Sequence, residues 1–298
     1  RMSFSSEVKQ ELAKQSGKSR HCQIAELAAL VAFDGKRQQL IGDAGDVLDS
    51  ENPLLQEKYG LLLAQLFHVN IEEIDTLPLE RILETIKMWN QSLRCADITE
   101  TVNGILLQQT CCRRAYIRGA FLAGGSISDP NKSYHFEIVC REIAQAKQLQ
   151  DAINSFEMEA KIVERKKYQV VYLKEGAQIV DMLNIMEAHV ALMNLENVRI
   201  LKEMRNSVNR KVNCETANIS KTVAAAVKQL GDIEYIKQNA GLDSLPENLK
   251  EMALLRLEYP DTPLKELGTY LDPPVGKSGV NHRLRRISEI ADELREKE

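Results

Sequence analysis

Two helical segments 90 residues apart end in related nonapeptides, and this repeat is the feature that most restricts the fold. The first reads Leu-Ala-Ala-Leu-Val-Ala-Phe-Asp-Gly over residues 27–35, and the second reads Ile-Arg-Gly-Ala-Phe-Leu-Ala-Gly-Gly over residues 117–125. Each closes a stretch with helical spacing of apolar residues, and glycine is common at a helix end. A period this long exceeds that of solenoid repeats. We therefore expect two related halves of one pseudo-symmetric domain.

The segments that follow these two helices repeat a coarse order of helix, strand, strand, helix and strand. In the first half, glycine-broken runs at 36–50 indicate short strands, Val69–Ile74 indicates a strand, and Leu79–Leu93 indicates a helix. In the second half, Tyr134–Cys140 alternates as a strand does, and two runs within 161–173 indicate a hairpin. The pattern predicts two αββαβ-type halves.

The chain divides by composition into a mixed and an all-helical part. We predict an α+β domain over residues 1–190, with its repeats at about 20–95 and 111–190. A polar helix over 191–220 is the expected linker. Residues 221–298 contain helical patterns joined by short glycine and proline connections, so we expect an all-α C-terminal domain there.

The C-terminal region contains three short amphipathic helices. The first begins near Leu245, the second begins at Pro263, and the third has Ser278 as its predicted N-cap after a turn at residues 272–277. A tight turn before the last helix is typical of a helix-turn-helix. The turn here is longer than the shortest known form, so the pattern fits the winged or sigma-like variety as well as the repressor type. A generic three-helix bundle with a solvated basic helix is the alternative.

The third helix has an apolar side that fixes which residues face outward. Its core side is defined by three residues at i, i+4 and i+7, namely Val280, Leu284 and Ile287. Arginine can bond guanine bidentately, asparagine can bond adenine, and arginine also suits phosphates. The predicted DNA-binding residues are therefore Lys277, Ser278, Asn281, His282, Arg283, Arg285 and Arg286.

The repeated nonapeptides resemble the LAGLIDADG motif of homing endonucleases. In that family the two motif helices pack side by side through small residues, and the penultimate aspartate of each motif binds a divalent metal for phosphodiester hydrolysis. This sequence has Asp34 in the first copy but Gly124 in the second, so the symmetric pair of carboxylates is broken. We expect no catalytic residue, with Asp34 vestigial, and no nuclease activity. An active endonuclease that uses Asp34 with an unrecognised second carboxylate is the alternative.

The chain resembles the WhiA family of bacterial regulators almost from end to end. Three uncommon strings carry the resemblance, at residues 113–127, 209–218 and 271–284. The resemblance implies a LAGLIDADG-like domain without nuclease activity and a C-terminal helix-turn-helix resembling sigma-factor region 4. It further implies transcriptional or chromosome-linked control of cell division, and of sporulation in spore-forming relatives.

Basic residues outside the last helix are candidates for contacts with the DNA backbone. In LAGLIDADG proteins two sheets form a saddle over the duplex. By resemblance, the surface of this saddle would include Lys36, Arg37 and a basic trio at residues 165–167. A solvated hairpin turn is the alternative for the trio, and a solubilised bridging helix is the alternative for the linker. The possible backbone contacts are Arg165, Lys166 and Lys167 in the hairpin, and Arg199, Lys202 and Arg205 in the linker helix.

The bulk composition limits the classes of partner and cofactor. Hydrophobic residues at 44% and charged residues at 28% indicate a globular chain, while a net charge of −4 argues against nonspecific coating of nucleic acid. The six cysteines contain no CxxC pair, and His21, His68 and His189 lack metal-ligand spacing, so we expect no metal, disulfide or other cofactor. The cysteines are Cys22, Cys95, Cys111, Cys112, Cys140 and Cys214.

These features predict a DNA-binding regulator rather than an enzyme. The start of the chain is polar and its apolar runs are short, so we expect a cytoplasmic, nucleoid-associated protein with double-stranded DNA as its partner and no membrane association. The acidic charge leaves a second hypothesis open. In that case the chain is a scaffold that acts mainly by binding a sigma factor, RNA polymerase or a division protein.

Overall fold

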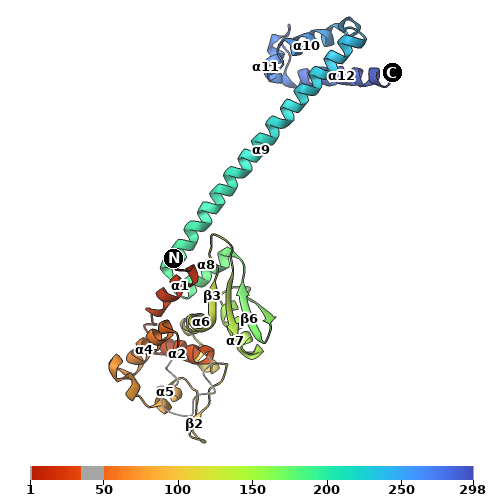
Figure 1. Cartoon of the computed structure of the whole chain (residues 1–298). Coiled ribbons are helices and arrows are strands. Elements are labelled where there is room, and N and C mark those ends of the chain that lie inside the picture. The colour runs from red at the N-terminus through yellow and green to blue at the C-terminus, as the bar shows by residue number, and fades with distance from the viewer. Residues whose placement is uncertain (1, 35–49, 298) are drawn as a thin grey trace. The chain divides into compact units, whose positions relative to one another are not determined.

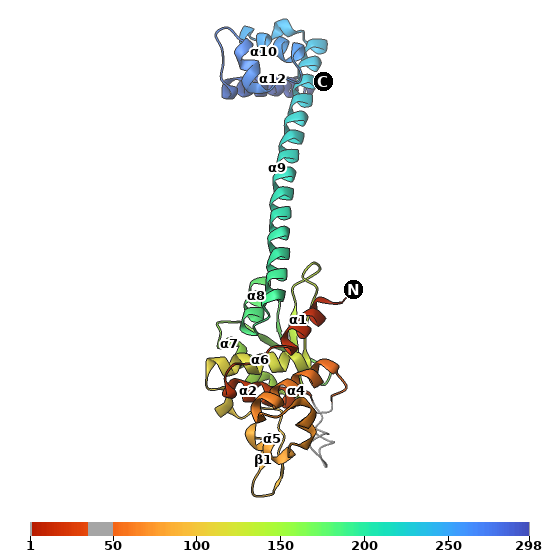
Figure 2. The same ribbon diagram turned by 90° about the vertical axis from the view of Figure 1, so that its left-hand side faces the viewer.

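The computed structural model describes residues 2–34 and 50–297. The chain separates into two compact units, unit 1 (Arg1–Glu203) and unit 2 (Met204–Glu298). Figures 1 and 2 show their elements from two directions. Helix α9 (His189–Asn239) runs without interruption through the expected linker and into the helical pattern that follows it. No helix within the described residues combines the length and hydropathy that a membrane crossing requires.

In its described residues, the first half of unit 1 is mostly helical. Its elements are α1 (Phe4–Ala13), α2 (Arg20–Asp34), α4 (Pro53–Phe67), the 3-10 helix η2 (Ile71–Thr76), α5 (Leu79–Thr85), the short strands β1 (Trp89–Asn90) and β2 (Cys95–Ala96), and η3 (Gly104–Leu107). Asn52 caps α4 by accepting a hydrogen bond from the backbone N–H of Leu54, and proline occupies the first turn. The strands predicted at 36–50, with Lys36 and Arg37, lie almost wholly outside the described residues.

Two element predictions in this half were wrong. The strand predicted at Val69–Ile74 is the 3-10 helix η2, in which only Ile74 is buried and Ile71 is exposed. A short apolar run does not distinguish a strand from a helical turn by itself. The helix predicted at Leu79–Leu93 ends at Thr85, because Lys87 adopts a left-handed φ of 63° that turns the chain into β1.

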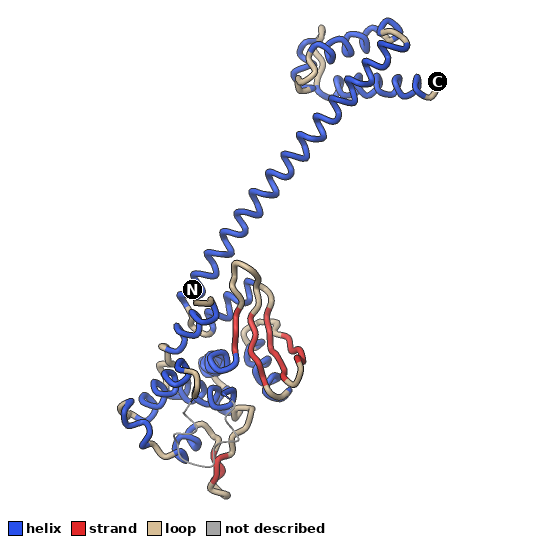
Figure 3. The backbone as a smooth tube through the Cα atoms, viewed as in Figure 1, coloured by secondary structure: helices blue, strands red, loops and turns tan. Residues whose placement is uncertain are grey.

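The second half of unit 1 carries a four-stranded antiparallel sheet. Its elements are α6 (Thr110–Gly124), β3 (Gly125–Ile127), β4 (Phe136–Cys140), α7 (Ile143–Asn154), β5 (Lys161–Arg165), β6 (Tyr168–Leu173) and α8 (Gly176–Ile185). The strand order is β3-β4-β6-β5, and Figure 3 shows these strands in red. The β5–β6 hairpin confirms the sequence prediction, and the half contains one strand more than the predicted αββαβ order.

Helices α2 and α6 pack side by side at the centre of unit 1 (Figure 2). A Cβ atom built on Gly119 of α6 would stand 2.7 Å from the Glu26 carbonyl oxygen and 2.9 Å from the Ala29 Cβ of α2. The contact therefore tolerates no side chain at Gly119, which confirms that small residues let the two helices approach closely. The apolar side of the sheet packs on α6 through residues of β4 such as Phe136 and Ile138.

Unit 2 is all helical. After α9 it contains η4 (Leu242–Ser244), α10 (Glu247–Glu258), α11 (Leu264–Leu267), η5 (Gly268–Tyr270) and α12 (Lys277–Arg295). The predicted apolar side of the last helix is buried, with Val280, Leu284 and Ile287 at most 1% exposed. The predicted N-cap, Ser278, lies two residues too late, because α12 begins at Lys277 with Gly276 as its N-cap residue.

The turn before α12 depends on Gly268. A Cβ atom built there would stand 1.9 Å from the carbonyl oxygen of Val275, while the Val275 N–H donates to the Gly268 carbonyl at 2.9 Å. Any side chain at Gly268 would therefore separate the two segments that this hydrogen bond joins. The glycine fixes where α12 starts relative to α11, and so fixes the orientation of the outward face of α12.

Candidate nucleic-acid interface

The first three turns of α12 present a polar and basic surface to solvent. The exposed residues among those predicted to bind DNA are Lys277, Ser278, Asn281, His282, Arg285 and Arg286. Arg283 is half-buried beside the core. The N-terminal end of a helix also carries partial positive charge from unpaired backbone N–H groups, which attracts phosphate. The geometry of this helix therefore suits contact with a nucleic acid.

Two of these arginines are paired with carboxylates on the same helix. The Arg286 Nη1 lies 2.8 Å from Glu289 Oε2 and 3.6 Å from Glu293 Oε1, and the Arg285 Nε lies 3.4 Å from Glu289 Oε1. The hydrogen bond from Arg286 lowers the pKa of Glu289 and raises that of Arg286. Glu289 therefore stays ionised, and it competes with any phosphate for both guanidinium groups.

A groove of about 620 Å³ lies beside the start of α12, within unit 2. Lys277 and Asn281 line it together with residues 221–230 of α9 and the connection between α10 and α11. The buried Arg256 shapes that connection by donating from Nη1 to the Thr262 carbonyl oxygen at 2.8 Å. Burial lowers the pKa of Arg256, although nearby Asp261 opposes the shift. The groove adjoins the predicted reading face but was not visible in the sequence pattern.

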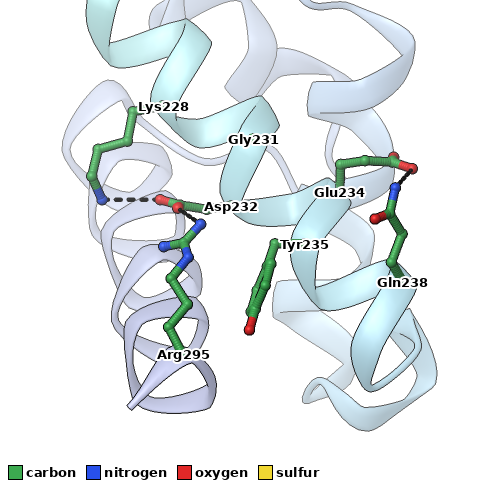
Figure 4. A pocket seen from close by; sticks show the side chains of 7 residues that line it. All are labelled: Lys228, Gly231, Asp232, Glu234, Tyr235, Gln238 and Arg295. Atoms are coloured by element: carbon green, nitrogen blue, oxygen red, sulfur yellow. Dashed lines mark hydrogen bonds and ion pairs between the residues drawn. The ribbon is translucent and has the colours of Figure 1, made fainter. Parts of the chain in front are cut away.

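An ion-pair cluster anchors the far end of α12 to α9, as Figure 4 shows. The buried carboxylate of Asp232 lies 3.0 Å from Lys228 Nζ and 2.8 Å from Arg295 Nη2, and the Arg295 guanidinium stacks 4.6 Å from the Tyr235 ring centroid. Burial alone would raise the pKa of Asp232, but hydrogen bonds from Ser288, Lys228 and Arg295 outweigh it and hold the pKa below its usual value. The sequence pattern did not reveal this anchor.

The predicted vestigial position, with Asp34 and Gly124, lies at the C-terminal ends of the two central helices in unit 1. The Asp34 Oδ2 accepts a hydrogen bond from the Tyr59 hydroxyl at 3.3 Å, and burial raises the pKa of that hydroxyl well above its usual value. Gly124 supplies no ligand, and a Cβ atom built there would stand 3.0 Å from the Val139 carbonyl oxygen. Asp34 therefore has a structural partner and lacks its symmetric carboxylate.

Among the described residues, one group of at least three His, Cys, Asp or Glu side chains is close enough to share a cation. It consists of His21, Cys22, Cys111 and Cys112, and Asp34 is not part of it. The sequence-based expectation of no metal site rested on local spacing, which cannot detect a group drawn from two distant helices.

The basic trio predicted to approach DNA lies at the β5–β6 turn. Arg165 ends β5 and pairs with Glu137 of β4 at 3.2 Å on the open side of the sheet. Lys166 takes the left-handed turn position, with φ of 58°, and Lys167 lies 5.3 Å from the Tyr168 ring centroid. All three side chains are exposed, but Glu137 neutralises the arginine nearest to the sheet.

Two of the three predicted linker cations make contacts within unit 1. Arg199 pairs with Glu196 at 3.1 Å, and the Lys202 Nζ donates to the Pro130 carbonyl oxygen at 2.6 Å and lies 4.8 Å from the Tyr134 ring centroid. Arg205 is exposed on α9. These contacts favour a structural role for Arg199 and Lys202 over phosphate binding.

A buried ionic network joins the central helices to their neighbours. Glu26 of α2 and Lys58 of α4 are 0% exposed, and Arg118 of α6 is 2% exposed. Glu26 lies 2.6 Å from Lys58 Nζ and 2.9 Å from Arg118 Nε, and Arg118 also reaches the half-exposed Glu187 at 2.9 Å. Burial lowers the pKa of Lys58 despite Glu26, whereas the two glutamates raise the pKa of Arg118 against the effect of burial.

The paired central helices and the helical C-terminal unit define the class of this protein, a LAGLIDADG-like domain joined to a domain of the helix-turn-helix type. Sequence models of two families match in the same order. The WhiA LAGLIDADG-like domain matches residues 113–205, and the WhiA C-terminal HTH domain matches residues 208–291.

Relatives along the whole chain identify the family. The chain is 51% identical to "Probable cell division protein WhiA" of Lachnoclostridium phytofermentans over 99% of this chain and 100% of the relative. It is 54% identical to the protein of the same name from Alkaliphilus oremlandii over 99% and 98%. This chain belongs to the WhiA family. The crystal structure of full-length DUF199/WhiA from Thermatoga maritima shares the fold, with a TM-score of 0.52 and 24% identity over 98% of this chain and 99% of that one.

Proposed function

We propose that this chain is a regulator of bacterial cell division, and of sporulation in spore-forming relatives, that binds double-stranded DNA through α12. The exposed polar and basic surface over the first three turns of α12 is the observation that carries the proposal. Asn281 and Arg285 have the side chains that read adenine and guanine edges in the major groove, while Lys277, Arg283 and Arg286 suit phosphates. Ser278 and His282 complete the outward face.

The electrostatics favour specific over nonspecific binding. The chain as a whole carries a net charge of −4, so its affinity for DNA depends on a local basic surface rather than on bulk attraction. Within α12 the basic residues predicted to bind DNA precede Glu289 and Glu293, which lie farther along the same helix. This distribution of charge along α12 favours an approach in which the start of the helix enters the major groove of DNA. Arg205 and the β5–β6 turn are secondary candidates for backbone contacts.

We further propose that the chain has no nuclease activity and acts in the cytoplasm in association with the nucleoid. Gly124 stands where the second metal-binding carboxylate of a LAGLIDADG nuclease is expected, and Asp34 accepts a hydrogen bond from Tyr59. A hydrolytic site for DNA requires several oxygen ligands around its cations. The central helices thus serve as a scaffold whose packing is retained.

A sigma factor or RNA polymerase is the proposed protein partner. The acidic net charge and the pairing of Arg285 and Arg286 with Glu289 limit the affinity that this chain can generate alone. A second DNA-bound protein would supply the missing affinity.

Genome-wide mapping of bound sites tests the proposed function. Cells would carry either the natural chain or a full-length variant with Arg283→Gln, Arg285→Gln and Arg286→Gln. We expect the variant to lose occupancy at the natural sites while its cellular level is unchanged. Full occupancy by the variant would contradict direct DNA binding by α12, and would favour recruitment by a protein partner.

A further inference from the structure

Four side chains of metal-ligating type meet in unit 1, where the first turns of α2 and α6 lie side by side. His21 and Cys22 belong to α2, and Cys111 and Cys112 belong to α6. Their ligand atoms all lie within 4.8 Å of one another. The cluster lies at the opposite ends of these helices from Asp34 and Gly124, so it is separate from the vestigial nuclease position.

The distances within the cluster match those around a tetrahedral cation. His21 Nδ1 lies 3.2 Å from the Sγ of Cys112, 3.4 Å from that of Cys22 and 3.9 Å from that of Cys111. Zinc bonds of about 2.3 Å to sulfur and 2.0–2.1 Å to nitrogen place tetrahedral S and N ligands roughly 3.5 Å apart. The three distances bracket this value, and three cysteines with one histidine form a common zinc ligand set.

The surroundings of the cluster also suit a bound cation. Cys22 and Cys112 are buried and pack on Ala25 and Ala115, which lie one turn farther along each helix. The connection before α2 passes so close that a Cβ atom built on Gly17 would stand 2.6 Å from the Cβ of Cys22. Two helix N-termini point their partial positive charge at the same place, which favours thiolates over thiols.

We propose that His21, Cys22, Cys111 and Cys112 form a structural zinc site that joins the first turns of the two central helices. Three thiolates and one zinc ion leave one net negative charge, which the two helix N-termini stabilise. With four protein ligands the coordination is complete, which is typical of structural rather than catalytic zinc. The ion links the two halves of unit 1 beside a small buried apolar cluster that contains Ala25 and Ala115.

The pairing of ligands follows the internal repeat of the chain. His21 and Cys111 are 90 positions apart, as are Cys22 and Cys112, and the two nonapeptides have the same offset. Each helix therefore contributes two ligands from equivalent positions. A disulfide between the two helices is the competing chemistry for these cysteines, and it would consume the thiolates that a zinc ion needs.

Metal analysis of the reduced, full-length protein tests the proposal. We expect one zinc ion per chain. Cobalt titrated into protein stripped of zinc should give the thiolate-to-metal charge-transfer band and the intense visible bands of tetrahedral Co²⁺. Zinc should also raise the melting temperature of unit 1, followed by the fluorescence of Trp89, the single tryptophan of the chain.

Variants assign the ligands and control for folding. Cys22→Ser and Cys112→Ser should abolish the cobalt bands, and Cys95→Ser and Cys214→Ser, at exposed cysteines outside the cluster, should leave them unchanged. His21→Ala removes an exposed side chain, so it should preserve the circular dichroism of the fold. It should weaken zinc binding by more than about 100-fold. Loss of a residue that only hydrogen-bonds to a ligand costs at most about 100-fold, so a larger effect identifies His21 as a ligand itself.

Three results would overturn the proposal. The first is a folded, reduced natural chain with little bound zinc and no cobalt charge-transfer band. The second is equal zinc affinity in the natural chain and in His21→Ala. The third is a disulfide between Cys22 and either cysteine of α6 in protein isolated from cells under alkylating conditions.

Discussion

Replacement of Glu26 by glutamine should destabilise unit 1 more than any other single change of charge in the buried network. The Glu26 carboxylate accepts hydrogen bonds at 2.9 and 3.0 Å from Arg118 and lies 2.6 Å from Lys58 Nζ, with all three side chains at most 2% exposed. Glutamine keeps the shape of the side chain but removes its charge, so two buried cations lose their shared counter-ion.

The size of the effect follows from burial. Breaking a buried ion pair by removing one partner costs about 3–5 kcal/mol, against about 5–15 kcal/mol for the whole stability of a typical domain. Arg118 retains Glu187 at 2.9 Å, and Lys58 retains the Leu12 carbonyl oxygen at 3.1 Å. We therefore expect a loss near the lower end, about 3 kcal/mol. The matched control Glu187→Gln removes a half-exposed carboxylate and should cost about 1 kcal/mol or less.

The pH dependence provides an independent check. Burial already lowers the pKa of Lys58, and loss of Glu26 should lower it further. A lysine whose pKa is lower in the folded state binds fewer protons there than in the unfolded state, so stability rises with pH up to the unfolded pKa. The stability lost in Glu26→Gln should therefore partly return as the pH rises from 7 towards 10.

Urea unfolding followed by Trp89 fluorescence measures this loss in unit 1, because the chain has no other tryptophan. Equal midpoints for Glu26→Gln and Glu187→Gln would refute the argument from burial. A deficit that does not change between pH 7 and 10 would refute the assignment of the penalty to an uncompensated Lys58.

Three further predictions concern α12 and the vestigial site. Glu289→Gln releases Arg285 and Arg286, so binding to DNA in low salt should tighten roughly two- to fivefold in a titration of labelled duplex, and unchanged or weaker binding would contradict the competition described above. Asp232 has a lowered pKa, so its stabilisation of unit 2 is present above the usual aspartate pKa and is lost as the pH falls through the pKa of the folded state. Asp232→Asn should therefore lower the melting temperature of unit 2 at pH 7, and this deficit should shrink below pH 4. A deficit that stays constant with pH would count against the ion pairs. The natural chain and Gly124→Asp should both leave plasmid DNA uncut with magnesium, and cleavage by the natural chain would show that a second carboxylate had been overlooked.

The sequence predicted the features that follow from regular periodicity. The i, i+4, i+7 pattern of Val280, Leu284 and Ile287 correctly placed the core side of α12, because a regular helix has a fixed angle per residue. The small residues of the repeated helices correctly predicted their close packing. The strand expected at Val69–Ile74 was wrong, because apolar spacing over six residues fits a 3-10 turn equally well.

The features that the sequence did not reveal depend on contacts between distant segments. Glu26, Lys58 and Arg118 appear as ordinary charged residues in helical patterns, and only the packing of three helices makes them a buried network. The His21 and Cys111 cluster was missed because metal-ligand spacing was sought locally. Alignment of the two repeats at an offset of 90 would have revealed it, since both ligands of each helix occupy equivalent positions.

The reading of bases by α12 is the central claim, and a specificity ratio tests it most directly. Binding of the natural chain, Asn281→Ala and Arg285→Ala would be measured at one salt concentration on a duplex with a mapped site and on a scrambled duplex. We predict that each variant loses about 1–3 kcal/mol on the site and far less on the scrambled duplex. Lys237→Ala, at an exposed lysine of α9, should keep the ratio of the natural chain. Equal losses of both variants on both duplexes would contradict base reading by this helix.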